Sequence, residues 1–368
     1  MTAIAFFPWL NCTAPMSFGA VRLIPYERGR LPGSRIAVPQ RTVDSLLGIY
    51  ADRPDRRIRR AVLLEVGDWR SGDGVDADIL SRLFFAKEAL AFSAISKRRL
   101  FSGHNYCNAG NFQLIVQNFD SAHSEGVTIS TRRRDGQTGN YWATRKIAFH
   151  IPMHINRTDI AFDEALVEVL MQQENEAWAD AITEFNSANS DSHDTPAHLE
   201  MIMVKSAFER LLGIGQRVDD FSKALEHLLS PFLAIDTPRV PLRSKWLERR
   251  PEAQSLLDEW ARDFCKIRGA SAHGNNRAKM PNAWSQAAHL AFASILFPLV
   301  FKILAQNSGK YSLIDEDLTR ISVLERYLAH DPFGAVESNI ASEKHPWQVI
   351  DNEIALAIIA RRLWSNLE

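Results

Sequence analysis

Short runs of hydrophobic residues alternate with turn-forming residues through the first 155 positions. Four of the runs are rich in β-branched and aromatic residues and are bounded by Gly, Asn or Asp, which is typical of strands. These strand candidates are residues 60–66, 112–119, 126–133 and 146–155. One helical run, about 76–100, lies between the first two, and Asp135-Gly136 indicates a hairpin between the last two. The pattern predicts an α+β domain over residues 1–155.

From about residue 158 the hydrophobic period becomes helical. The first of these helices is expected to begin at Thr158 or Asp159 and to place Phe162, Leu166 and Leu170 on one stripe. A second helix opens at Thr195-Pro196. Further helical runs are expected near 218–232, 256–267, 282–306, 316–329 and 350–366. The pattern therefore predicts a mainly α-helical domain over residues 156–368, and no repeat of fixed period is evident.

Composition places the chain among soluble globular proteins. It has 368 residues, which suits two domains, with 46% apolar and 24% charged residues. The N-terminus lacks a basic region, so we expect no secretory signal. The apolar stretch 290–304 is interrupted by Pro298 and Lys302 and is too short to span a membrane, which predicts a buried core helix. We expect a cytoplasmic protein with no membrane partner.

Three cysteines, Cys12, Cys107 and Cys265, are widely separated and odd in number. This argues against a disulfide framework and against a cysteine-based zinc site. His150 and His154 are four residues apart on a candidate strand, but no third ligand accompanies them, so a metal site is not expected. No Gly-rich phosphate loop is present either, and the sequence predicts no cofactor.

Charge is distributed unevenly along the chain. Residues 1–155 carry 21 Lys and Arg against 13 Asp and Glu, a balance of +8, whereas residues 156–368 carry 22 against 31, a balance of −9. The N-terminal half is therefore the better candidate for contact with an anionic partner. Alternatively, the opposite net charges serve to hold the two halves of the chain together. The Arg runs at 56–60 and 132–134 suit contact with a nucleic acid backbone, or a solvated surface.

The stretch CKIRGASAHGNN, residues 265–276, brings Arg268 and His273 within five positions. Spacing alone does not single it out, because 32 Arg and 11 His in 368 residues give about one chance match (11 × 32/368), and the chain holds three. The context does: Arg268 lies at the end of an amphipathic helix, and a glycine directly follows each member of the pair, Gly269 after Arg268 and Gly274 after His273. Five residues of straight helix separate two side chains by about 140°. We therefore expect Gly269 to break the helix.

This stretch resembles the HEPN superfamily of small helical domains. The resemblance covers about residues 195–306 and includes the preceding helix AHLEMIMVKSAFERLL and the following AWSQAAHLAFASILFPL. It implies a four-to-five-helix bundle, a dimer that forms a cleft, and in many members a metal-independent ribonuclease using an Arg-x(4 to 6)-His motif. The overall arrangement is similar to HEPN proteins of bacterial antiphage and abortive-infection systems, which often carry an N-terminal sensor domain. RNA, a second copy and a phage-derived trigger or partner protein are the implied partners.

The residue types suit RNA cleavage without a metal. His273 can serve as general base or acid near neutral pH, and Arg268 offers permanently charged donors to phosphate oxygens. Lys266 can add positive field, and Asn275 can orient the substrate. The family often has Asn, Asp or His after the Arg; Gly269 departs from this and favours an alternative, a catalytically inactive HEPN-like dimerisation or scaffold module in a larger defence complex.

Two further alternatives remain open on the sequence. Arg268 and His273 also suit the polar end of an ordinary helix, where cations and Gly are common. A ligand-binding role located entirely in the first 155 residues is the other. The segment LFSGHNYCNAGNF, with His104, Tyr106 and Cys107, suits a ligand pocket, but its composition favours an ordinary connecting loop.

Overall fold

The computed structural model describes most of the chain as two compact units. Unit 1 comprises Met1–Lys97 and Cys107–Gln172, and unit 2 comprises Arg98–Tyr106 and Gln173–Glu368. The described residues are 2–30, 38–53, 56–101, 106–119, 127–132, 138–143, 149–150, 160–172, 175–192, 194–232, 253–272, 283–329, 333 and 345–365. The expected boundary was at residue 155, whereas the contacts place the helix 164–171 with unit 1.

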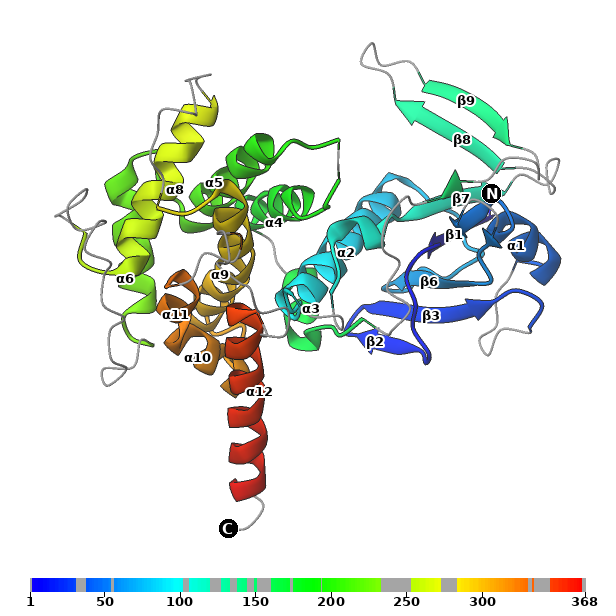
Figure 1. Ribbon diagram of the computed structural model, residues 1–368. Coiled ribbons are helices and arrows are strands. Elements are labelled where there is room, and N and C mark those ends of the chain that lie inside the picture. The colour runs from blue at the N-terminus through cyan, green and yellow to red at the C-terminus, as the bar shows by residue number, and fades with distance from the viewer. Residues whose placement is uncertain are drawn as a thin grey trace, which may run out of the picture. The chain divides into compact units, whose positions relative to one another are not determined.

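A five-stranded sheet forms the centre of unit 1 (Figure 1). Its order is β2-β3-β6-β1-β7, and every pairing is antiparallel. The strands are β1 (Thr2–Phe7), β2 (Met16–Phe18), β3 (Val21–Glu27), β6 (Arg60–Val66) and β7 (Ile115–Phe119). β1 and β6 are continuous apolar runs, AIAFF and AVLL, because both faces of the sheet are covered.

One face of the sheet packs against helix α1 (Gln40–Leu47). Phe6, Tyr26 and Leu63 join Val43 and Leu47 in this core. The opposite face carries the alternate residues of the same strands. There Phe7 meets Phe112 of the short helix η1 (Ala109–Phe112), with ring centroids 6.1 Å apart, and α2 (Ala77–Ser96) contacts β6.

Smaller elements complete unit 1. β10 (Phe149–His150), β4 (Tyr50–Arg53) and β5 (Arg56–Arg57) form a three-stranded sheet, and β8 (Val127–Arg132) pairs with β9 (Thr138–Ala143) as an antiparallel hairpin. The helix α3 (Glu164–Met171) contacts α2. The amide of its N-cap residue, Asp163, donates to Ser93 Oγ at 2.7 Å, and Ser93 Oγ donates to the Asp163 carbonyl at 2.9 Å.

Unit 2 is helical throughout its described elements. They are α4 (Glu176–Ala188), α5 (Ala197–Leu212), α6 (Val218–Leu229), α8 (Leu256–Ala272), α9 (Gln286–Asn307), α10 (Asp315–Ser322), α11 (Leu324–Leu328) and α12 (Pro346–Ser365). Aromatic rings fill the space between them. Phe208 of α5 lies 5.3 Å from Phe221 of α6 and 5.0 Å from Phe297 of α9, while Trp260 of α8 lies 4.8 Å from Phe292 of α9.

The helix α9 is the apolar stretch that the sequence singled out. It alone among the described helices is long and apolar enough to span a membrane by length and composition, with a mean hydropathy of 1.9. However, 72% of that window is buried within the protein, and even Lys302 is fully buried. α9 is therefore the core helix of unit 2, as its interruption by Pro298 and Lys302 predicted.

The coarse prediction of the fold is confirmed: an α+β unit is followed by a mainly helical one. The start expected at Thr158 or Asp159 for the first helix is wrong, and two helices follow in this part of the chain. Asp163 caps α3 instead, by accepting a bond from the Leu166 amide, and the Asn175 side chain caps a separate helix, α4. These two polar side chains satisfy amide groups that a continuous helix would have bonded internally, so the chain restarts at each.

Candidate functional site

Arg268 lies near the C-terminal end of α8, on a helix held firmly by its apolar face. Trp260, Phe264 and Ile267 of this helix are at most 7% exposed. Trp260 stacks on Phe264 with ring centroids 5.0 Å apart. This packing fixes the backbone from which Arg268 projects, and Lys266 projects from the same turn. Both cationic side chains are half-buried.

The guanidinium of Arg268 has hydrogen-bonding capacity that the described residues do not use. Its Nε is buried and has no hydrogen-bond partner among them. Two other arginines with a buried Nε differ, because Arg28 donates through Nη1 to the Ile58 carbonyl at 3.1 Å, and Arg320 donates through Nη2 to Glu316 at 3.2 Å. A buried donor without a partner is uncommon in proteins. Arg268 is thus a described cation with an unused donor at the end of α8.

The expectation that Gly269 breaks the helix is wrong. The helix α8 runs through Gly269 to Ala272. Glycine costs a helix about 1 kcal/mol relative to alanine, which the burial of a large apolar face outweighs. A Cβ added at Gly269 would meet nothing within 4 Å, so no neighbouring atom requires glycine here.

The remaining predicted site residues, His273 and Asn275, lie outside the described residues, as do His104 and His154. Cys107 is described and is 3% exposed. It precedes η1, where the Asn111 side chain accepts a hydrogen bond from the Asn108 amide at 3.0 Å. These features belong to a structured connection between α2 and β7.

A buried carboxylate and imidazole pair near Arg268 was not anticipated from the sequence. Asp263 Oδ2 lies 3.1 Å from His289 Nε2 and accepts a bond from the Ala283 amide at 3.0 Å. His289 is fully buried between Trp260, Phe264 and Trp284, and its Nδ1 has no partner among the described atoms. The pair is inaccessible to a substrate and ties α8 to the start of α9.

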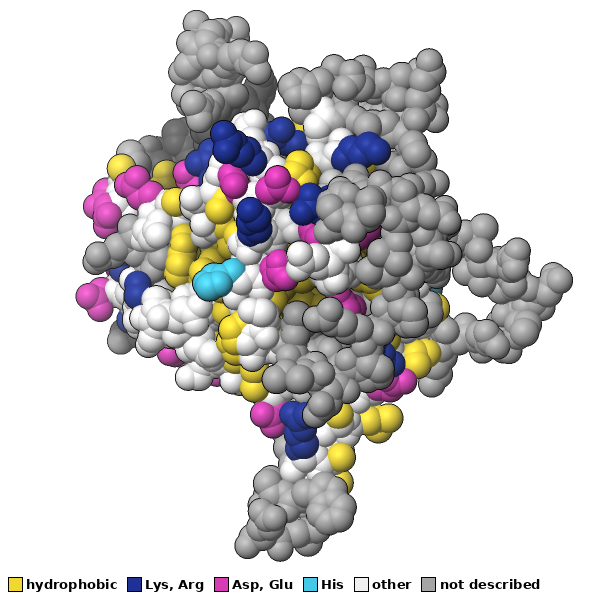
Figure 2. Space-filling model, turned by 90° about the vertical axis from the view of Figure 1, so that its left-hand side faces the viewer, with side chains coloured by type: hydrophobic (Ala, Val, Ile, Leu, Met, Phe, Trp, Pro, Cys, Tyr) yellow, Lys and Arg dark blue, Asp and Glu magenta, His cyan; other side chains and the backbone are white. Residues whose placement is uncertain are grey.

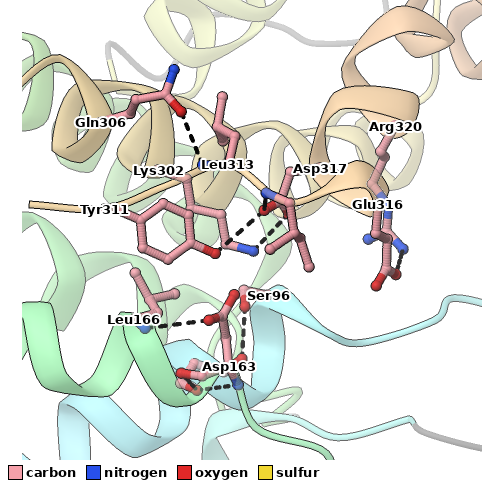
Figure 3. Close-up of polar contacts among 12 residues, drawn as sticks. Ser96, Asp163, Leu166, Lys302, Gln306, Tyr311, Leu313, Glu316, Asp317 and Arg320 are labelled. Carbon is pink, nitrogen blue, oxygen red and sulfur yellow. Dashed lines mark hydrogen bonds and ion pairs between the residues drawn. The ribbon is translucent and has the colours of Figure 1, made fainter. Parts of the chain in front are cut away.

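A second buried ion pair, between Lys302 and Asp317, links α9 to α10, and both carboxylate oxygens of Asp317 accept hydrogen bonds (Figure 3). Lys302 Nζ donates to Asp317 Oδ1 at 2.7 Å. The other oxygen of Asp317 accepts bonds from the Tyr311 hydroxyl and the Ile314 amide, each at 3.3 Å. Because each oxygen of Asp317 is bonded, this lysine is a structural cation and not a free nucleophile.

Two carboxyl groups of unit 2 have raised pKa values. Burial, followed by the negative charge of Asp191, raises the pKa of Glu200 to about 7. Burial also raises the pKa of Asp351, which accepts a hydrogen bond from the Tyr327 hydroxyl at 2.7 Å. No group of three or more His, Cys, Asp or Glu in the described part of the chain is placed to hold a metal ion.

Comparison with known proteins returns nothing: no protein-family model matches this chain, and no curated protein or solved structure matches it significantly. The case for a function therefore rests on the residues themselves and on the resemblance in their pattern.

Proposed function

We propose that this chain is a metal-independent RNA endonuclease of a bacterial antiphage or toxin-type defence system, with Arg268 and His273 as its catalytic residues. The observation that carries the proposal is the half-buried guanidinium of Arg268, whose Nε has no partner among the described residues. The packed apolar face of α8 fixes the backbone from which that guanidinium projects, and a cation positioned before any substrate arrives supports electrostatic stabilisation of a transition state.

The reaction proceeds by attack of the substrate's own 2′-hydroxyl. A general base removes the hydroxyl proton, the 2′-oxygen bonds to phosphorus, and the bond to the leaving 5′-oxygen breaks as an acid protonates that oxygen. The products are a 2′,3′-cyclic phosphate and a 5′-hydroxyl end. His273 performs one of the two proton transfers, because an imidazole exchanges protons near neutral pH. Arg268 holds the phosphorane oxygens with a charge that it cannot lose.

Lys266 and Asn275 contribute to substrate binding and take no part in the proton transfers. Lys266, two residues before Arg268 and half-buried like it, adds positive potential at the end of α8. Asn275 orients the RNA. In this proposal the enzyme works in the cytoplasm, needs no cofactor or membrane, and is activated when unit 1 senses a phage-derived trigger or partner protein.

A homodimer is part of the proposal, and the helix α12 offers a surface for it. Its outer side exposes Val349, Leu356, Ile359 and Leu363, with 38, 65, 54 and 61% of each residue accessible. Figure 2 shows hydrophobic side chains along the part of α12 that extends away from the rest of unit 2. Val349, Leu356 and Leu363 are seven residues apart, the heptad spacing by which a helix pairs with a second copy of itself.

The same surface favours the second candidate function, an inactive HEPN-like module that only dimerises or scaffolds a larger defence complex. Self-association through α12 needs no catalysis, and Gly269 departs from the motif of the active family members. The two functions differ in one respect: only the nuclease requires Arg268 and His273.

The decisive experiment compares the wild type with the Arg268→Ala/His273→Ala double variant in cells challenged with phage. We expect RNA fragments with 2′,3′-cyclic phosphate ends, and growth arrest, from the wild type alone. Loss of the Arg268 donor costs about 10²–10³-fold in rate and loss of a general acid or base about 10²–10⁴-fold, so residual cleavage should escape detection.

Arg217→Ala is the matched control, because Arg217 is an exposed arginine before α6. It should leave cleavage unchanged. RNA fragmentation by the folded double variant at the wild-type level would refute the proposed nuclease activity. A wild type that dimerises without fragmenting RNA would favour the scaffold function.

A further inference from the structure

β3 ends and β6 begins at the same end of the sheet of unit 1, beside α1 (Figure 1), and three segments of the chain carry arginines there. The Arg28 amide donates to the Arg59 carbonyl at 2.8 Å, and Glu27 lies opposite Arg60 in the register of β3 and β6. The arginine cluster consists of Arg28, Arg30, Arg41, Arg56, Arg57, Arg59 and Arg60. Arg41 belongs to it because its neighbour in α1, Gln40, donates through Nε2 to the Arg30 carbonyl at 2.9 Å.

Carboxylates at this end are too few to neutralise the cluster. Arg22 pairs with Glu65 at the other end of β3, and without it residues 27–60 contain nine Arg and no Lys against four Asp and Glu, a balance of +5. Glu27 is shared by Arg30 at 2.9 Å and Arg60 at 3.6 Å, while Asp44 accepts bonds from the Tyr26 hydroxyl at 3.0 Å and the Gly29 amide at 3.3 Å. The excess positive charge therefore faces solvent.

Some of these guanidinium groups are bonded to backbone carbonyls, and other arginines of the cluster are exposed to solvent. Arg28 Nη1 donates to the Ile58 carbonyl at 3.1 Å, and Arg57 Nη1 donates to the Ile49 carbonyl at 3.2 Å. A carbonyl fixes the position of the guanidinium without cancelling its charge. Arg56 and Arg59 are exposed beside them. The cluster thus combines a fixed positive field with side chains that can reach a ligand.

We propose that the arginine cluster binds the phosphodiester backbone of a nucleic acid, independently of base sequence. The Arg fork matches phosphate oxygens, and contact with several phosphates needs several cations along one surface. A protein partner would need a buried apolar or aromatic anchor. No large hydrophobic residue is exposed among the described residues from 2 to 66, which disfavours both a protein partner and insertion into a lipid surface. Only the choice of RNA as the nucleic acid rests on the proposed function.

The test measures binding of a fluorescently labelled single-stranded RNA by anisotropy over a range of salt concentrations. The full chain carries Arg268→Ala throughout, so that cleavage cannot interfere. Arg56→Gln/Arg59→Gln removes two charges from the cluster, and Arg217→Gln/Arg361→Gln removes two exposed arginine charges from unit 2. We expect the cluster variant to bind more weakly and to lower the slope of log K against log salt by about 1.4, at about 0.7 for each lost phosphate contact. The control should keep the wild-type slope.

Three outcomes of the RNA experiment would overturn the proposal: equal slopes for the Arg268→Ala protein and a folded cluster variant, an equal loss in the control, or no binding of RNA by the Arg268→Ala protein. A fourth is arginine-dependent binding to vesicles of anionic phospholipid in place of RNA. The result is separable from the nuclease proposal, because binding is measured without cleavage. If RNA binds through the cluster but is never cut in cells, the binding proposal holds and the nuclease proposal is refuted.

Discussion

Among single residues, Glu200 has the pKa most relevant to neutral pH, because burial and the charge of Asp191 raise it to about 7. A carboxyl whose pKa is higher in the folded state is easiest to accommodate when protonated. Its favourable contribution is complete at pH values below its unfolded pKa of about 4.5 and is lost as the pH rises through about 7. Glu200 should therefore destabilise the folded protein in mildly alkaline solution.

We predict that Glu200→Gln makes the protein more stable than the wild type at pH 8, by a margin that is much smaller at pH 5. The amide cannot ionise, so the cost of a partly buried charge disappears, whereas at pH 5 only the unfolded wild-type carboxyl, with its pKa of about 4.5, is largely ionised. Urea unfolding at both pH values measures the difference. A variant that is no more stable than the wild type at pH 8 would contradict the assignment of Glu200 as the titrating group.

Among secondary-structure elements, α12 has the most exposed aliphatic side chains of the described helices. We predict that Leu356→Asp converts a wild-type dimer into a monomer in sedimentation equilibrium, because an aspartate at the centre of the paired stripe would be desolvated without a partner. Leu80→Asp on α2 is the control, since Leu80 is also exposed but lies in unit 1. A wild-type monomer, or a Leu356→Asp dimer of unchanged affinity, would exclude α12 as the dimer surface.

The sequence predicted helices and strands best where the spacing of hydrophobic residues stayed regular along a whole element. The expected strands at 60–66 and 126–133 correspond closely to β6 and β8, the amphipathic runs correspond to α5 and α6, and the apolar run corresponds to α9. β1 was missed because a strand covered on both faces loses the alternation that marks strands. α1 and β5 were missed because their Arg- and Pro-rich surroundings resemble loops. The hairpin loop expected at Asp135-Gly136 lies outside the described residues.

The candidate site was predictable only where it is local in sequence. Arg268 and Lys266 lie on the helix expected for them. Asp263 and His289, by contrast, are 26 residues apart, and no spacing rule links a carboxylate on one helix to an imidazole on another. The break expected at Gly269 failed for a related reason, because the tertiary contacts of Trp260 and Phe264 outweigh the low helix propensity of a single glycine.

At the scale of the whole molecule, the two units share the chain in an interleaved way. The segment Arg98–Tyr106 lies between stretches of unit 1 in sequence but belongs to unit 2. Within unit 2, Arg98 donates to the Asn189 side chain at 2.7 Å, and the Phe101 ring stacks on His345 at 3.8 Å and lies 5.9 Å from Trp347. Phe101 keeps this position with a φ of +56°, a conformation that bulky residues rarely adopt.

We predict that Phe101→Ala weakens protection of the amides at the start of α12 by roughly 2 kcal/mol in hydrogen exchange, less than the cost for a fully buried Phe. Amides of β1 and β6 should keep their protection. Phe84→Ala on α2, which removes an exposed ring from unit 1, should leave α12 unchanged. Unaltered exchange in α12 of the Phe101 variant would show that the segment does not support unit 2.

The interleaving also constrains how such a protein can be built and inherited. The backbone passes between the units three times, at residues 97–98, 106–107 and 172–173. A protease that cuts at one of these junctions produces two fragments, and one of them still contains parts of both units joined by the backbone. Nor can a recombination event with one breakpoint exchange either unit as an intact cassette. An exchange of one whole unit for another needs breakpoints at all three junctions, 97–98, 106–107 and 172–173.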